Sequence, residues 1–112
     1  GLELARGAGL TARIDSNKLP LLSGVQALAE QGVFTGASGR NWASYGNHIE
    51  LGAGVSDARK ALLTDPQTSG GLLVSCDADS VDQVLKLFAT SGFANAAVIG
   101  HMEAGEAKVV VD

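Results

Sequence analysis

Residues 62–74 read LLTDPQTSGGLLV and join the end of a short helix to an apolar run. Pro66 prevents the helix from continuing. Gly70 and Gly71 then lead into Leu72–Cys76, an apolar run of the kind typical of a strand buried on both faces. The stretch therefore predicts a helix, a tight turn and a strand in the centre of a sheet.

Local signals predict four helices. Each combines apolar spacing with a start or a stop residue. They are the end of a helix at Leu2, Leu4 and Ala5 before Gly7 and Gly9; a helix capped by Ser23 and Gln26 that ends before Gly32; a helix from Ser56 to Leu63 with Asp57 in its first turn; and a helix opened by Asp79, with Val81, Val84, Leu85 and Phe88 on one face and Gly92 as its stop.

The remaining β-like runs flank this helical region. Leu10–Ile14 alternates as a half-buried strand does, while Ala96–Met102 and Lys108–Val111 form a predicted hairpin around the loop Glu103–Ala107. Residues 32–55 have no steady period and predict a long loop, functional or merely mobile. Strands and helices interleave, so the predicted class is α+β, a mixed sheet packed with helices.

Composition sets the scale of the protein. The chain of 112 residues is 46% hydrophobic and is predicted to form a single domain, residues 1–112. Its net charge of −4 offers no basic field for nucleic acid, and no apolar run reaches membrane-spanning length. One cysteine, Cys76, leaves no internal disulfide, so a reducing cytoplasm is expected. The apolar spacing of the first helix starts partway through a helical pattern, which predicts a domain cut on its amino-terminal side.

The turn within residues 62–74 is the candidate binding segment. Gly70 and Gly71 would let backbone N–H groups approach an anion, while Thr68 and Ser69 would donate from their hydroxyls. Asp65 would accept a hydrogen bond or face a cation. The alternative is a simple strand-entry turn, and no Gly-x-x-x-x-Gly-Lys-Ser/Thr sequence exists, which excludes a P-loop.

The loop predicted over residues 32–55 carries a second candidate pair. Arg40 would grip a phosphate in forked geometry, and Asn41 would bond substrate or a facing domain. Trp42 and Tyr45 are expected to anchor the loop by burying their rings. The alternative for Arg40 is an ordinary solvated side chain.

Other reactive side chains have plainer interpretations. Cys76 is expected to be a buried, inert core residue because it lies in the apolar run. His48 and His101 have no partner at metal-ligand spacing and are expected to be structural or solvent-exposed. No residue of the chain is predicted to be catalytic or to bind a metal.

Two segments together carry a family resemblance. DPQTSGGLL after a short helix resembles the signature of the carboxy-terminal domain of selenophosphate synthetases, and GASGRNWASYG, residues 36–46, is similar to the glycine-rich stretch of that family. The resemblance runs over nearly the whole chain. It implies the carboxy-terminal domain of the aminoimidazole ribonucleotide synthetase-like fold.

The resemblance also implies an activity for a longer protein. The family converts selenide and ATP to selenophosphate, AMP and phosphate, and requires magnesium. It implies a homodimer whose amino-terminal ATP-binding domain, absent here, carries the reactive cysteine or selenocysteine, its lysine and most metal-binding aspartates. This chain would cover or position the site through Arg40, Asn41, Asp65, Thr68, Ser69, Gly70 and Gly71, and would be inactive and bind neither ATP nor Mg²⁺ alone.

Two kinds of alternative remain at the level of sequence. One is a different ATP-dependent enzyme of the same superfamily, namely aminoimidazole ribonucleotide synthetase, thiamine-monophosphate kinase or the hydrogenase maturation factor. The other is a non-catalytic binding module that uses the long loop. An upstream reading frame that encodes an ATP-binding domain would eliminate the second alternative.

Overall fold

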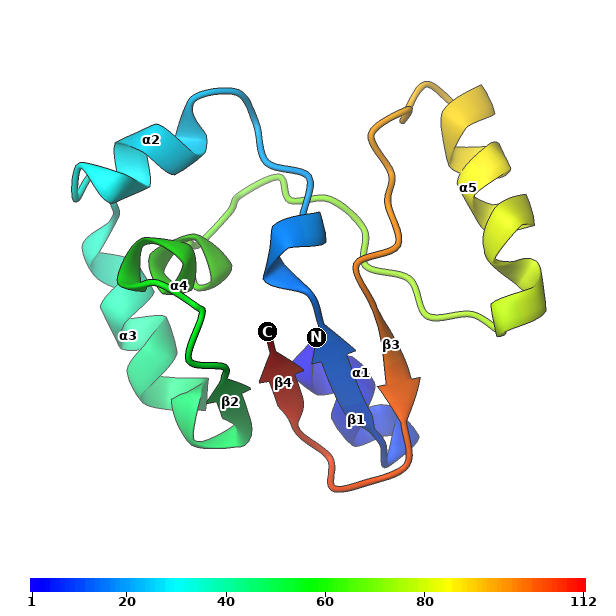
Figure 1. The fold of residues 1–112 in the computed structure, drawn as a ribbon, viewed down its shortest axis with the longest axis horizontal. Helices are drawn as coiled ribbons and strands as arrows, with labels where there is room; N and C mark the ends of the chain where they lie inside the picture. Colours follow the sequence, from blue (N-terminus) through cyan, green and yellow to red (C-terminus); the bar gives the residue numbers. More distant parts are fainter.

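The computed structural model describes all 112 residues, and a four-stranded sheet of order β2-β4-β1-β3 forms its centre (Figure 1). Strand β1 (Thr11–Ile14) pairs parallel with β4 (Val109–Val111) and antiparallel with β3 (Gly100–Glu103). Strand β2 (Ile49–Leu51) pairs parallel with β4. The sheet is mixed, which confirms the α+β class.

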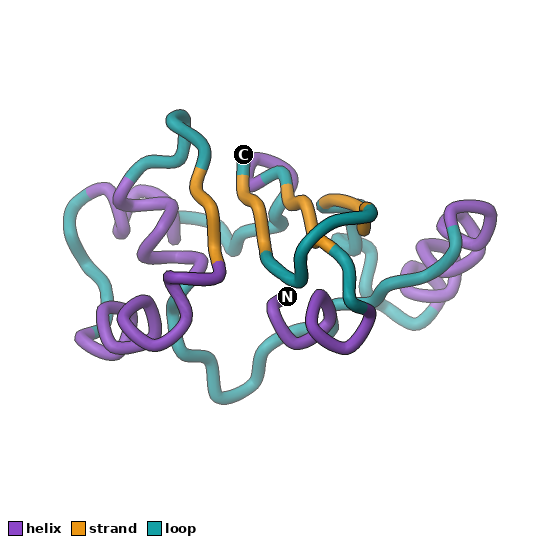
Figure 2. The backbone as a smooth tube through the Cα atoms, turned by 90° about the horizontal axis from the view of Figure 1, so that it is seen from below, coloured by secondary structure: helices purple, strands orange, loops and turns teal.

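Helix α1 (Leu2–Ala8) packs against one face of this sheet (Figure 2). Ala5 is completely buried there, against Ala12, Val109 and Val111. The small alanine side chains let the helix lie close to the strands. The helix ends at Gly9, whose φ of 64° is the left-handed cap that the sequence predicts.

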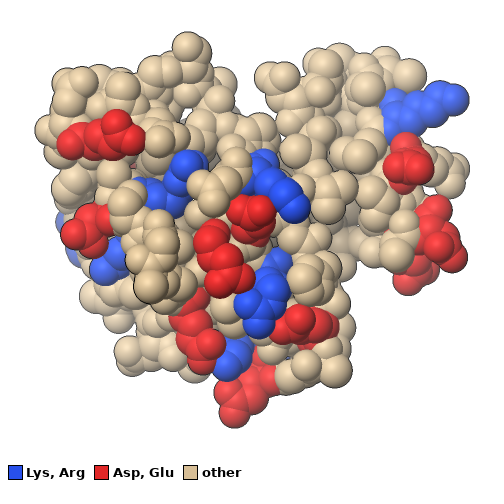
Figure 3. All heavy atoms as spheres, in the orientation of Figure 1, with Lys and Arg blue, Asp and Glu red and all other residues tan.

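The opposite face of the sheet is charged, and acidic and basic side chains lie together over it in Figure 3. Arg13 pairs with Glu103 at 3.1 Å and with Asp112 at 3.0 Å, and Lys108 pairs with Glu50 at 2.6 Å. Hydrogen bonds between Arg13 and Glu103 raise the pKa of Arg13 and lower that of Glu103. Such exposed pairs contribute little stability each.

The other helices lie beside the sheet. Helices α2 (Val25–Glu30), α3 (Gly36–Tyr45) and α4 (Asp57–Leu63) form a group next to β2, whereas α5 (Val81–Thr90) stands apart on the side of β3 (Figures 1 and 2). Three short 3₁₀ turns complete the structure: η1 (Ser16–Lys18), η2 (Gly46–His48) and η3 (Ala78–Ser80). None of the helices combines the length and apolar character needed to cross a membrane.

All four predicted helices are confirmed, as α1, α2, α4 and α5, but one predicted cap is wrong. At the start of α4, the Ser56 hydroxyl accepts a hydrogen bond from the Arg59 backbone N–H at 3.2 Å. Helix α2 forms as expected, but its N-cap is Gly24 at φ 81°, without a side-chain cap. Gln26 donates instead to Glu30, one turn along the same helix, at 3.0 Å. The predicted capping box therefore does not form.

The long loop predicted over residues 32–55 is also wrong. This stretch contains α3, η2 and β2. Its glycines and small polar residues hide the helix because they weaken both the apolar period and the intrinsic helix propensity. Contacts with α4, described below, hold α3 in place.

The predicted central strand at Leu72–Cys76 is not present. These residues have no backbone partner, and Leu72 is 83% exposed. Cys76 is exposed rather than buried, so the expectation of a core thiol is wrong for this chain. An apolar run favours burial of its side chains, but it does not specify a neighbouring strand with which to pair.

The predicted terminal hairpin is replaced by a crossover. Strands β3 and β4 do not pair with each other, because β1 lies between them. The connection passes the end of β1, where the Thr11 hydroxyl donates to the Glu106 carbonyl at 2.7 Å. Of the predicted strand Ala96–Met102, only residues 100–102 lie in β3. Strand spacing alone does not reveal an inserted strand.

Candidate functional site

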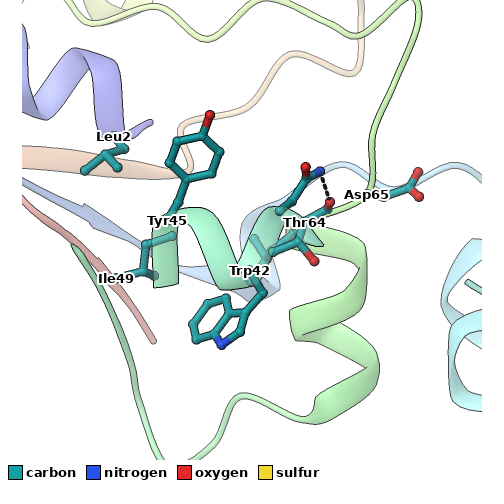
Figure 4. A pocket seen from close by; sticks show the side chains of 8 residues that line it. Leu2, Trp42, Tyr45, Ile49, Thr64 and Asp65 are labelled. Carbon is teal, nitrogen blue, oxygen red and sulfur yellow. Dashed lines mark hydrogen bonds between the residues drawn. The ribbon is translucent and has the colours of Figure 1, made fainter. Parts of the chain in front are cut away.

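Helix α3 and the end of α4 meet directly before the DPQTSGG segment. The Asn41 side-chain amide donates to the Thr64 backbone carbonyl at 2.8 Å, the dashed line in Figure 4. At the N-cap of α3, more than one helical turn before Asn41, the Thr35 hydroxyl donates to the Asp65 carboxylate at 3.5 Å, a long contact. The two segments that stand out in the sequence are therefore in contact, at the amino end of the turn.

A second contact joins the same two helices. The Lys60 ammonium lies 4.2 Å from the centre of the Trp42 ring, within the range of a cation–π interaction. Trp42 is half-buried, as expected of an anchoring ring. Tyr45 is 50% exposed, so the expectation that it also buries its ring is wrong.

A shallow cavity of about 260 Å³ opens beside this junction (Figure 4). Apolar and aromatic side chains make most of its wall, and the hydrogen-bonded amide and the start of the turn make its polar edge. Its lining residues are Leu2, Asn41, Trp42, Tyr45, Ile49, Leu63, Thr64 and Asp65.

The expected donors of the turn are all at the surface. Thr68, Ser69, Gly70 and Gly71 are exposed and make no hydrogen bond within the chain. Arg40 projects from α3, is also exposed, and has no salt bridge. No hydrogen bond links Arg40 to residues 68–71, so the chain by itself brings Asn41, but not Arg40, to the turn.

The chemistry of this donor set fits a phosphate better than a metal ion. A guanidinium, two hydroxyls and exposed glycine backbone present N–H and O–H groups, which anions accept. Asp65 is the one carboxylate of the turn. The structure has no group of three or more His, Cys, Asp or Glu side chains placed to hold a metal.

The two histidines lie outside this region. His101 contacts Glu103 at 3.2 Å on the charged face of the sheet, and His48 is exposed in η2. Both placements agree with the expectation of structural or solvent-exposed side chains.

Sequence reasoning missed three residues of the junction: Thr35, Lys60 and Thr64. Each acts through a contact between helices that the sequence did not reveal, because residues 32–55 had no helical period. Thr35 stands at the N-cap of α3, a position that threonine favours, and this was the one local signal available.

The fold and the junction define a class: a mixed α+β domain that presents a donor-rich turn held by a neighbouring helix. The chain belongs to the family described as AIR synthase related protein, C-terminal domain, whose profile matches residues 2–112. The fold expected from the family resemblance is thereby confirmed.

Curated relatives are similar over nearly all of this chain. A protein of Pseudomonas straminea named "Selenide, water dikinase" is 77% identical over 111 residues, 99% of this chain and 31% of the relative. Proteins of the same name from Burkholderia pseudomallei and Rhizobium meliloti are 60% and 43% identical, over 98% and 99% of this chain and 31% and 32% of the relatives. The chain thus spans about a third of the length of these relatives.

Proposed function

We propose that this chain is the carboxy-terminal domain of a selenide, water dikinase. The whole enzyme would use one ATP and Mg²⁺ to transfer one phosphoryl group to selenide and one to water, releasing selenophosphate, AMP and phosphate. The observation that carries the proposal is the junction of the two signature segments through Asn41 and Thr64. The similarity to proteins of that name over 99% of the chain supports it.

In this proposal the domain aims donors at the nucleotide phosphates held by an amino-terminal domain. Arg40 supplies a forked cation, Thr68 and Ser69 supply hydroxyls, and Gly70 and Gly71 supply unobstructed backbone N–H groups. Phosphoryl transfer depends mainly on positioning and on electrostatic stabilisation, so donors of this kind affect rate without acting as nucleophiles. The exposure of all these groups in the isolated chain supports the assignment.

Asp65 and Asn41 have supporting roles at the amino end of the turn. The Asn41 N–H is engaged by the Thr64 carbonyl, which leaves the amide oxygen for substrate or for the facing domain. Asp65 would accept a hydrogen bond or face the Mg²⁺ of the nucleotide. When bound, that ion neutralises phosphate charge.

The setting of the whole enzyme is part of the proposal. We place it in the cytoplasm, as a homodimer in which each subunit joins this domain to an ATP-binding domain. The single cysteine of this chain is compatible with a reducing compartment.

The test is turnover by the full-length protein and by this chain alone, each with selenide, ATP and Mg²⁺. Phosphorus NMR would follow selenophosphate and AMP. We expect selenide-dependent AMP formation by the full-length protein and none by the isolated chain above a heat-killed control. A full-length protein without selenide-dependent AMP formation would contradict the proposed activity, and an active isolated chain would contradict the division of roles.

A further inference from the structure

The last carbonyl groups of a helix need partners from beyond its regular bonds, and at the end of α4 the carbonyls of residues 60–62 receive theirs from Thr64 and Asp65. The Thr64 carbonyl, at the C-cap of α4, receives its hydrogen bond from outside the helix. The donor is the side-chain amide of Asn41 on α3, at 2.8 Å, and the contact is partly buried. This bond fixes the direction of the backbone where the chain leaves α4.

The segment that follows has no other tether. Residues 66–76 are exposed and make neither backbone nor side-chain hydrogen bonds within the chain. The contact of Thr35 with Asp65 is long, at 3.5 Å. The Asp65 backbone N–H donates to the Leu62 carbonyl at 3.3 Å. The Asn41 bond, at 2.8 Å, is the shortest polar contact at this exit and the one that joins it to another helix.

The other tie between the helices acts at a different place. Lys60 lies over Trp42 one turn before the end of α4, so it holds the helix pair together without contacting the exit of the chain. If only the Asn41 bond were lost, α3 and α4 would stay paired through Lys60 and Trp42. The backbone at Thr64, where the chain leaves α4, would then be held less firmly. The Lys60–Trp42 contact thus holds the two helices together, whereas the Asn41–Thr64 bond orients the backbone that leaves α4.

We propose that Asn41 is a positioning residue that aims the DPQTSGG turn through the Thr64 carbonyl. The inference rests on the proposed function for its kinetic consequence, but not for its structural one. Asn41→Asp keeps the size of the side chain and replaces the donor with an oxygen that faces the carbonyl oxygen. We expect kcat of the full-length enzyme to fall about tenfold or more, with KM for ATP changing less than threefold, because misaimed donors act at the transition state.

The experiment measures amide hydrogen exchange and steady-state kinetics of the full-length protein side by side. In Asn41→Asp, exchange should rise at the Thr64 and Asp65 amides, which donate to the Ala61 and Leu62 carbonyls at the exit of α4, while exchange at β4 stays unchanged. The matched control is Ser44→Ala on the same helix, which removes a bond from the Ser44 hydroxyl to the Arg40 carbonyl without touching α4. The control should change neither exchange nor kcat.

Several results would overturn the proposal. Unchanged exchange at the Thr64 and Asp65 amides would mean that Asn41 does not hold the start of the turn, and a lower kcat would then indicate direct substrate contact. Faster exchange throughout the domain would indicate a structural role only. Should the carboxylate prevent folding, Asn41→Ala must give the same local pattern, and its failure to do so also refutes the inference. If the wild-type protein forms no AMP from selenide and ATP, the proposed function fails, while the exchange comparison still decides the role of Asn41.

Discussion

Val111 is the residue through which the core can be tested most sharply. Its side chain is 2% exposed, on β4 in the centre of the sheet, in the cluster with Ala5, Ala12 and Val109. Val111→Ala removes two buried methyl groups. At about 0.8 kcal/mol for each, the transfer loss is about 1.6 kcal/mol, and the remaining cavity brings the expected destabilisation to about 2–3 kcal/mol.

Urea unfolding of the chain measures this loss. With a slope of about 2 kcal/mol per molar urea, the midpoint should fall by about 1–1.5 M while the slope stays constant. Val98→Ala is the matched control, because that side chain is 48% exposed and lies outside the core cluster. It should cost less than about 0.5 kcal/mol. Equal losses in the two variants would refute the placement of the core between α1 and the sheet.

Three further predictions follow from local structure. Ser56→Ala should destabilise the chain by about 1 kcal/mol in the same urea assay, whereas Ser23→Ala should do nothing, and the reverse order would restore the capping box at Ser23. Cys76 should react with a thiol reagent in the native chain, and labelling only after denaturation would show that it is buried. The bonds from Arg13 hold the pKa of Glu103 below its ordinary 4.5, so their contribution is present above pH 4.5 and is lost as the pH falls through the lowered value. An NMR titration that finds Glu103 at or above 4.5 contradicts that pairing.

The sequence was informative wherever a local signal fixed the structure. Gly9 ends α1, Ser56 begins α4, and the apolar face of α5 is unmistakable, because caps and the 3.6-residue period act within a few residues. The family resemblance likewise depended on short contiguous segments. These parts of the fold could be predicted from the chain itself.

The wrong predictions concern segments whose structure depends on contacts with residues far away in the sequence. Helix α3 has glycines at positions 36 and 39, each costing about 1 kcal/mol relative to alanine, and its hold on α4 through Asn41 depends on a residue 23 positions away. The hairpin prediction failed because β1, about 90 residues earlier, lies between β3 and β4. The apolar run at residues 72–76 showed the same limit, since its pattern specifies no partner.

The candidate site was half predictable for the same reason. The hydrogen-bond donors of the turn, residues 68–71, could be predicted because hydroxyl side chains and glycines are recognised from residue type alone. The contact that holds the start of the turn could not be predicted, because Asn41 bonds the backbone carbonyl of Thr64, a group that every residue possesses.

The most direct test of the central claim is turnover per folded molecule after removal of the turn's hydroxyls. Thr68→Ala with Ser69→Ala, in the full-length enzyme, should lower kcat about tenfold or more and leave the unfolding midpoint unchanged, because water satisfies exposed hydroxyls in the fold but cannot replace aimed donors at a transition state. Ser75→Ala, an exposed hydroxyl a few residues farther along, is the matched control and should leave kcat unchanged. A lowered midpoint with unchanged turnover per folded molecule would contradict the claim and reduce DPQTSGG to a turn between two elements.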